Sequence, residues 1–228
     1  MKVLFVINNL NTGGAEKLLS DAIPCFDEQG IHTNVLLLDG NPYPFLTELE
    51  SKNCCKIHKL GNGNVYNPLL IFKIIPYLKN CDVVHVHLFP ALYWVALAKL
   101  ISFAKVPLIF TEHSTTNRRR KRLLYKWTDK FIYSQYSVLI TISTEVKLFL
   151  KRHLGKIRTT FRTINNGVTI SWFQNAEKTN RDDFYIPSTH TIIMQVARFT
   201  PQKDPATLVR AVPYFEHPTT VLLVGEGV

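Results

Sequence analysis

The chain has 228 residues, and its 27 lysine and arginine residues against 17 aspartate and glutamate residues give a net charge of +10. Hydrophobic residues make up 46% of the chain and charged residues 19%, which excludes intrinsic disorder and fibrous repeats and predicts a globular protein with a large core. The length fits one large domain, or one domain and part of another.

Short apolar runs alternate with longer segments of helical periodicity along most of the chain. We expect strands at residues 2–8, 33–39, 55–60, 82–88, 107–113 and 137–143, and helices at residues 14–29, 67–79, 90–104, 120–135 and 144–154. Several of these strands are apolar almost throughout, which is typical of a sheet covered on both faces. The sequence therefore predicts an α/β fold with a doubly wound, parallel, Rossmann-like sheet.

The pattern changes in a polar segment, residues 168–190, which we interpret as a connection between domains. An N-terminal domain would then span residues 1–167, and residues 191–228 would begin a second Rossmann-like unit. That unit would contain, in order, a strand, a helix and a strand, at residues 191–198, 205–215 and 219–225. Because two strands and one helix are too few to bury their own apolar faces, we expect this unit to be the start of a larger domain.

The sequence shows no targeting or disulfide pattern. Asn8 and Asn9 interrupt the first apolar run before a signal-peptide core could form, and the most apolar stretch, residues 88–110, is broken by prolines and lysines. The four cysteines form no C-x-x-C pair. We expect a cytoplasmic protein with reduced thiols and no transmembrane helix.

Two glycines, Gly13 and Gly14, lie between the first predicted strand and the first helix. Glycines in such a loop permit positive φ angles and close approach of a ligand, while the N-terminus of the following helix favours an anion. The sequence matches neither G-x-G-x-x-G nor a P-loop, so a tight turn without a ligand remains an alternative.

Histidines follow two of the predicted strands at the ends where parallel sheets bind ligands. His85 and His87 end one strand, and Glu112 and His113 end the next. The position of His113 favours a catalytic role. A metal site at His85 and His87 has little support, because no further ligands occur at suitable spacing, and both could be structural histidines.

Arg198 and Lys203 follow the first strand of the second unit. A guanidinium group and a nearby ammonium group could bind a pyrophosphate and stabilise the charge that develops on a leaving group. Two solvated charges in a loop are the alternative.

Basic residues are concentrated between residues 117 and 162, where 13 lysines and arginines face only two acidic residues. The run begins with five consecutive basic residues: Arg118, Arg119, Arg120, Lys121 and Arg122. Apolar residues follow directly, so the run is expected to contact an anionic membrane. Nucleic acid binding and a solvated helix face remain alternatives.

Taken in order, the motifs of this chain resemble those of family 4 glycosyltransferases, which have the GT-B fold of two Rossmann-like domains. The motifs are NTGGAEK, DVVHVHL, PLIFTEHS, ITIS, NNGV with a phenylalanine five residues later, VARFTPQKD and VLLVGEGV. Together they extend over nearly the whole chain.

The resemblance implies transfer of a sugar from a nucleotide-sugar donor to an acceptor, with retention of anomeric configuration. Its catalytic residues would be His113 near the donor sugar, with Arg198 and Lys203 on the diphosphate. Residues expected to contact substrate are Gly13, Gly14, His87, Glu112, Asn166, Gly225 and Glu226. No Asp-x-Asp occurs in the chain, which agrees with catalysis that needs no metal or other cofactor.

The family also carries two glutamates seven residues apart in its C-terminal domain, and the sequence ends before they could appear. We therefore expect the 228-residue chain alone to be inactive, as part of a transferase that builds a polysaccharide or glycolipid. The alternative is a non-catalytic basic module that binds an anionic membrane or nucleic acid. A nucleotide-sugar epimerase would share the fold, but it explains the NNGV and VGEG segments less well.

Overall fold

The computed structural model describes residues 1–115 and 123–227. The chain forms two compact units, Met1–Val168 and Thr169–Val228, and each is considered separately below. The placement of an interdomain connection at residues 168–190 stays a prediction.

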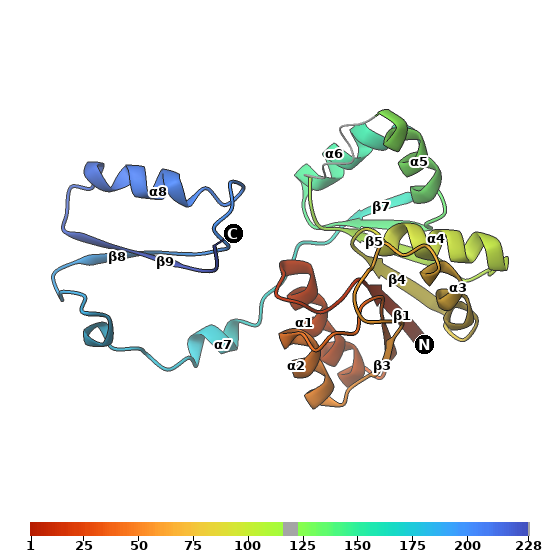
Figure 1. Ribbon diagram of the computed structural model, residues 1–228, viewed down its shortest axis with the longest axis horizontal. Coiled ribbons are helices and arrows are strands. Elements are labelled where there is room, and N and C mark those ends of the chain that lie inside the picture. Colours follow the sequence, from red (N-terminus) through yellow and green to blue (C-terminus); the bar gives the residue numbers. More distant parts are fainter. Residues whose placement is uncertain (116–122, 228) are drawn as a thin grey trace. The chain divides into compact units, whose positions relative to one another are not determined.

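Seven strands among the described residues of the first unit form one parallel sheet in the order β3-β2-β1-β4-β5-β6-β7 (Figure 1). They are β1 (Lys2–Ile7), β2 (His32–Leu37), β3 (Lys56–Lys59), β4 (Val83–His87), β5 (Leu108–Glu112), β6 (Val138–Thr141) and β7 (Thr160–Thr163). The chain moves outward from β1 in one direction and then, from β4, in the other. This parallel, doubly wound arrangement confirms the predicted fold class.

Helices lie on both faces of this sheet. They are α1 (Gly14–Glu28), α2 (Pro44–Lys52), α3 (Leu70–Ile74), α4 (Ala91–Ser102), α5 (Leu123–Tyr133) and α6 (Thr144–Leu154), with a 3-10 turn, η1 (Ile75–Lys79), after α3. One core packs α1 and α2 against β1 and β2, around Phe5 and Leu37. The other packs α3 to α6 against the opposite face, around Val86 and Phe110.

Two elements of the first unit were missed by the sequence prediction. Helix α2 begins at Pro44, in a segment for which the sequence analysis gave no helix or strand, and proline is well tolerated in the first turn of a helix. Strand β7 has only four residues, and most of them are exposed at the edge of the sheet. A short polar strand of this kind lacks the apolar run on which the prediction depended.

The second unit contains a two-stranded parallel sheet of β8 (Thr191–Val196) and β9 (Thr219–Val224). The other elements are α7 (Ile170–Gln174), α8 (Pro205–Ala211) and the 3-10 turns η3 (Arg181–Phe184) and η4 (Val212–Tyr214). Most apolar residues of the two strands are only half-buried, and Met194 is 60% exposed and Val196 70%. The described strands of this unit therefore leave much of their apolar surface accessible to solvent.

None of the described helices is long and apolar enough to cross a membrane.

A buried carboxylate joins three helices of the first unit. Asp129 of α5 is fully buried, and its two oxygens accept hydrogen bonds from the Tyr93 hydroxyl of α4 and from Nε2 of His153, 2.7 Å away in α6. Because an unpaired buried carboxylate or hydroxyl is costly, these bonds fix the three helices on one face of the sheet.

Replacing Asp129 should therefore destabilise the fold. We expect Asp129→Ala to lower the free energy of unfolding of the first unit by about 2–4 kcal/mol, since it removes the shared acceptor of two partly buried polar side chains, Tyr93 and His153. Urea unfolding monitored by circular dichroism would measure this. Asp27→Ala, at an exposed position of α1, is the control, and an equal loss in both variants would contradict the role of Asp129.

Candidate functional site

The loop between β1 and α1 ends at Gly13, which precedes the first residue of the helix, Gly14. Gly13 has an extended backbone with φ −154°, so it does not use the positive φ expected from the sequence. A Cβ atom at Gly13 would lie 2.2 Å from Oε2 of Glu16, whereas one at Gly14 would meet open space. The contact is with the carboxylate end of the Glu16 side chain, which can move aside. The helix that follows has 15 residues, and the anion contact expected at its first turn stays a prediction.

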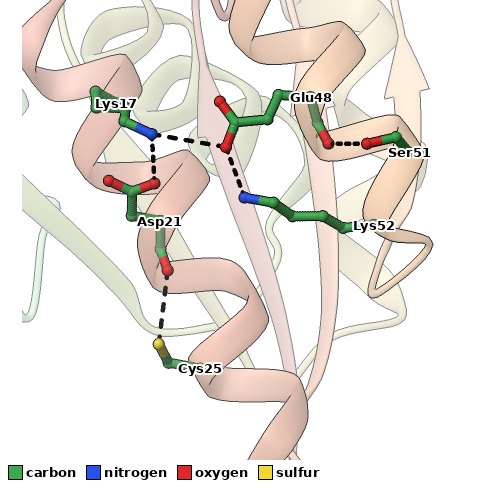
Figure 2. A network of polar contacts seen from close by, with 6 residues as sticks. All are labelled: Lys17, Asp21, Cys25, Glu48, Ser51 and Lys52. Carbon is green, nitrogen blue, oxygen red and sulfur yellow. Dashed lines mark hydrogen bonds and ion pairs between the residues drawn. The ribbon is translucent and has the colours of Figure 1, made fainter. Parts of the chain in front are cut away.

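Lys17, the lysine of the NTGGAEK motif, joins α1 to α2 (Figure 2). Its Nζ lies 2.8 Å from Oδ1 of Asp21 and 3.6 Å from Oε1 of Glu48, and the same Glu48 oxygen accepts from Nζ of Lys52 at 2.7 Å. The hydrogen bond from Lys52 is the main cause of a lowered pKa at Glu48. Lys17 of the motif therefore has a structural role, because it links the start of α1 to α2.

The two histidine-bearing strands bring His87 and His113 together. His87 in β4 pairs in register with Thr111 in β5, and His113 follows two residues later on the same side of the sheet. Nδ1 of His87 lies 3.0 Å from Nε2 of His113, within hydrogen-bond distance. His85, two residues before His87, stacks beside it with ring centroids 4.4 Å apart, and its Nε2 lies 2.7 Å from the Thr111 hydroxyl.

All three histidines are held in the neutral form. Burial lowers the pKa of His85 to about 3, with a further contribution from His113, and burial lowers the pKa of His113 to about 4. For His87, burial and the two neighbouring rings lower the pKa well below its usual value. At neutral pH the group can donate and accept hydrogen bonds, but it does not provide a fixed positive charge.

A cavity of about 430 Å³ lies on the same face of the sheet. His85, His87 and Thr111 line it together with apolar residues such as Phe26 and Ile140. Asn166, which follows β7, also lines it, so the structure places this predicted residue and His87 around one cavity. Helix α1 borders the cavity on one side, through residues such as Leu19 and Phe26.

Glu112 has a different environment from its neighbour His113. Its carboxylate is buried and accepts a 2.7 Å hydrogen bond from the Tyr133 hydroxyl of α5. Since successive residues of a strand point to opposite faces, this bond lies on the other side of the sheet from the histidines. The predicted contact of Glu112 with substrate stays a prediction.

Asn8 is a residue of this site that the sequence did not indicate. Its side-chain amide donates to the carbonyl of Phe89 at 2.8 Å and its carbonyl accepts from the N–H of Ala91 at 3.2 Å. The two bonds tie the loop that follows His87 to the end of β1. An asparagine directly after a buried strand is the only signal that could have suggested it.

In the second unit, the four predicted residues lie at the carboxyl ends of β8 and β9. Arg198 and Lys203 are exposed in the loop after β8, where Lys203 accepts a 2.8 Å hydrogen bond from Gln195 through its backbone oxygen. The backbone of Glu226 accepts from Phe199 at 2.8 Å, which continues the strand pairing beyond β9. A Cβ atom at Gly225 would lie 1.9 Å from the Ala197 oxygen, so only glycine fits this close approach.

The five basic residues predicted to contact a membrane, residues 118–122, lie outside the described residues. The described part of the basic segment includes α5, where Lys126 is exposed. On the same helix, Trp127 is 75% exposed and Phe131 54%.

Among the described residues, no cluster of three or more His, Cys, Asp or Glu side chains could hold a metal ion. That catalysis needs no metal stays a prediction.

The first unit has a Rossmann-like architecture of the kind found in proteins with the GT-B fold. Residues 12–172 match the family described as Glycosyltransferase Family 4. This match extends over more than half of the chain, and the chain therefore belongs to that family. The suspected family resemblance is thereby confirmed.

Solved structures with the same fold support the class. HepE from Anabaena, in complex with UDP and glucose, aligns over 100% of this chain and 62% of its own, with 21% identity and a TM-score of 0.80. A glycosyltransferase from Rickettsia africae aligns over 98% of this chain and 60% of its own, with 20% identity and a TM-score of 0.73. WaaB, a lipopolysaccharide outer core galactosyltransferase, aligns over 100% of this chain and 61% of its own, with 15% identity and a TM-score of 0.66.

The chain spans only about three fifths of the length of these structures. At such identities the similarity shows the fold alone. No curated protein sequence gives a significant match.

The neutral histidines should make the fold sensitive to acid. An unfolded histidine binds its proton near pH 6.5, whereas the folded pKa of His85 is about 3, so the unfolded state binds more protons between these values. Stability contributed by neutral His85 is therefore complete above about pH 6.5 and is lost as the pH falls below it.

We expect His85→Leu to reduce the loss of unfolding free energy between pH 7 and pH 5 by about 1–2 kcal/mol. Urea unfolding at the two pH values, with the parent chain alongside, measures the difference. An equal pH dependence in the variant and the parent would contradict the neutral state of His85.

Proposed function

We propose that this chain is part of a retaining glycosyltransferase that transfers a sugar from a nucleotide-sugar donor to a polysaccharide or lipid-linked acceptor. The family match over residues 12–172 carries the proposal. The bound UDP and glucose in HepE, and the galactosyltransferase activity named for WaaB, support a hexosyl donor attached to a nucleoside diphosphate. Because the chain spans 62% of HepE, we propose that transfer requires a longer protein than these 228 residues.

The site residues would divide the work of this reaction. His113 would contact the donor sugar, and the N–H groups at the start of α1, beside Gly13 and Gly14, would approach the donor phosphates. Arg198 and Lys203 would neutralise the charge that develops on the leaving diphosphate. With these two cations in that role, we propose that the reaction needs no metal ion, and turnover unchanged by a chelator would support this.

Removal of either cation tests these roles. In the full-length protein, Arg198→Ala and Lys203→Ala should each lower kcat by about 100-fold, because the leaving group loses a charge partner in the transition state. Release of nucleoside diphosphate from the donor measures the rate. Lys178→Ala, at another exposed lysine of the second unit, is the matched control. Turnover that is unchanged in both test variants would contradict the assignment.

A second proposal concerns location: the protein is cytoplasmic and binds peripherally to the inner face of the cell membrane. Trp127 and Phe131 lie one helical turn apart on α5, both largely exposed, beside the exposed Lys126. An aromatic pair bordered by basic residues suits the boundary between anionic headgroups and acyl chains. A non-catalytic module that binds membranes or nucleic acid is the alternative function, and the same surface would serve it.

Vesicle binding tests this surface. We expect the chain to bind vesicles that contain anionic phosphatidylglycerol more tightly than vesicles of phosphatidylcholine alone, and to lose affinity about tenfold in the Trp127→Ser, Phe131→Ser double variant. Tyr66→Ser removes an exposed aromatic residue elsewhere on the first unit and is the control. Equal binding by the double variant and the parent, or a preference for duplex DNA over the vesicles, would contradict membrane binding by this surface.

A further inference from the structure

His87 is almost completely enclosed, with 4% of its surface exposed. The ring of Phe5 lies 6.2 Å from its ring on one side, and His85 stacks on it with centroids 4.4 Å apart. Its only described side-chain hydrogen bond joins Nδ1 to Nε2 of His113, 3.0 Å away. His87 borders the 430 Å³ cavity, and its Nδ1 is the atom that joins it to His113.

The hydrogen bond between the two rings contains one proton, and each neutral ring carries one N–H. Two arrangements satisfy this count. In the first, His87 donates from Nδ1, and the proton of His113 is on its own Nδ1. In the second, His113 donates from Nε2, and the proton of His87 is on Nε2.

The surroundings of His87 distinguish the two arrangements. Its Nε2 is buried and has no hydrogen-bond partner among the described residues. The second arrangement would place a proton there, creating a buried N–H donor without an acceptor, which is rarer in proteins than an unused acceptor. The first arrangement leaves only a buried lone pair without a donor, which is the less costly of the two, so it is favoured.

We propose that His87 is a positioning residue that holds His113 in the tautomer protonated at Nδ1. This inference rests on the proposed function and gives His113 a definite part in it. Because Nε2 of His113 is engaged by His87, Nδ1 is the nitrogen left for a ligand, and it is an N–H donor. His113 then donates a hydrogen bond to an oxygen of the donor sugar and does not act as a general base.

Two contacts fix the position of the His87 ring. The ring of His85 lies against it and is itself held by a 2.7 Å hydrogen bond between its Nε2 and the Thr111 hydroxyl. The register of β4 with β5 fixes the backbone of His87 opposite Thr111. These contacts hold Nδ1 of His87 directly opposite Nε2 of His113. A fixed donor at this point selects one tautomer of His113 in the absence of any ligand.

Nitrogen-15 NMR of the labelled chain tests the tautomer directly. Long-range proton–nitrogen correlations distinguish the protonated from the bare nitrogen of each imidazole. We expect the proton of His113 on Nδ1 and the proton of His87 on Nδ1 in the parent chain. A proton on Nε2 of His113 would overturn the proposal, and this reading needs neither a variant nor a substrate.

Two variants then separate positioning from packing. The amide nitrogen of Asn takes roughly the place of Nδ1, so His87→Asn should keep His113 protonated at Nδ1, whereas His87→Leu should give a mixture of tautomers. In the full-length enzyme, His87→Leu should lower kcat about fivefold to tenfold, the equivalent of one lost hydrogen bond, and His87→Asn should restore most of it. The same tautomer and the same kcat in parent and His87→Leu would overturn the role of His87.

The two proposals fail in different ways. If the parent enzyme consumes no nucleotide sugar, the proposed function fails, while the NMR spectrum still decides the tautomer. If the parent is active and His113→Ala slows it but His87→Leu does not, the function stands and the positioning role is wrong.

Discussion

The parallel pairing of β4 with β5 is the constraint on which the site of the first unit depends. It sets His87 opposite Thr111, and the period of two along a strand then brings His113 to the same face. A shift of one residue in this register would turn His113 to the opposite face and place Glu112 beside His87. The hydrogen bond of Glu112 to Tyr133 opposes such a shift, because it fixes the residue between the two site positions to α5.

Burial then determines the chemistry of the histidines. Apolar neighbours such as Phe5 and Ile140 line the same face as the three rings, and the low polarity keeps the rings neutral. A neutral imidazole is a directional donor or acceptor, which is useful at a sugar hydroxyl.

The sequence alone was sufficient to predict the order of most strands and helices, because each of them contains an apolar run or a periodic segment that is long enough to recognise. It failed at β7, whose four residues are mostly polar, and at α2, a nine-residue helix in a segment for which no element was expected. It also expected a positive φ in the loop before the first helix, whereas Gly13 has an extended backbone.

The candidate site could be located from the sequence but not resolved in detail. The rule that ligands bind at the carboxyl ends of parallel strands was enough to select His87 and His113. Their hydrogen bond, the clamp formed by Asn8 and the buried Asp129 depend on contacts between residues 24 to 83 positions apart in the chain. No periodicity or spacing in the sequence encodes such pairs.

The most direct measurement is donor turnover by the full-length protein against a panel of nucleotide sugars, beginning with UDP-glucose. Release of nucleoside diphosphate, with the sugar transferred in unchanged anomeric configuration, is the expected result for at least one donor. If no donor in the panel binds in calorimetry or is consumed, the central claim that this fold serves sugar transfer is contradicted.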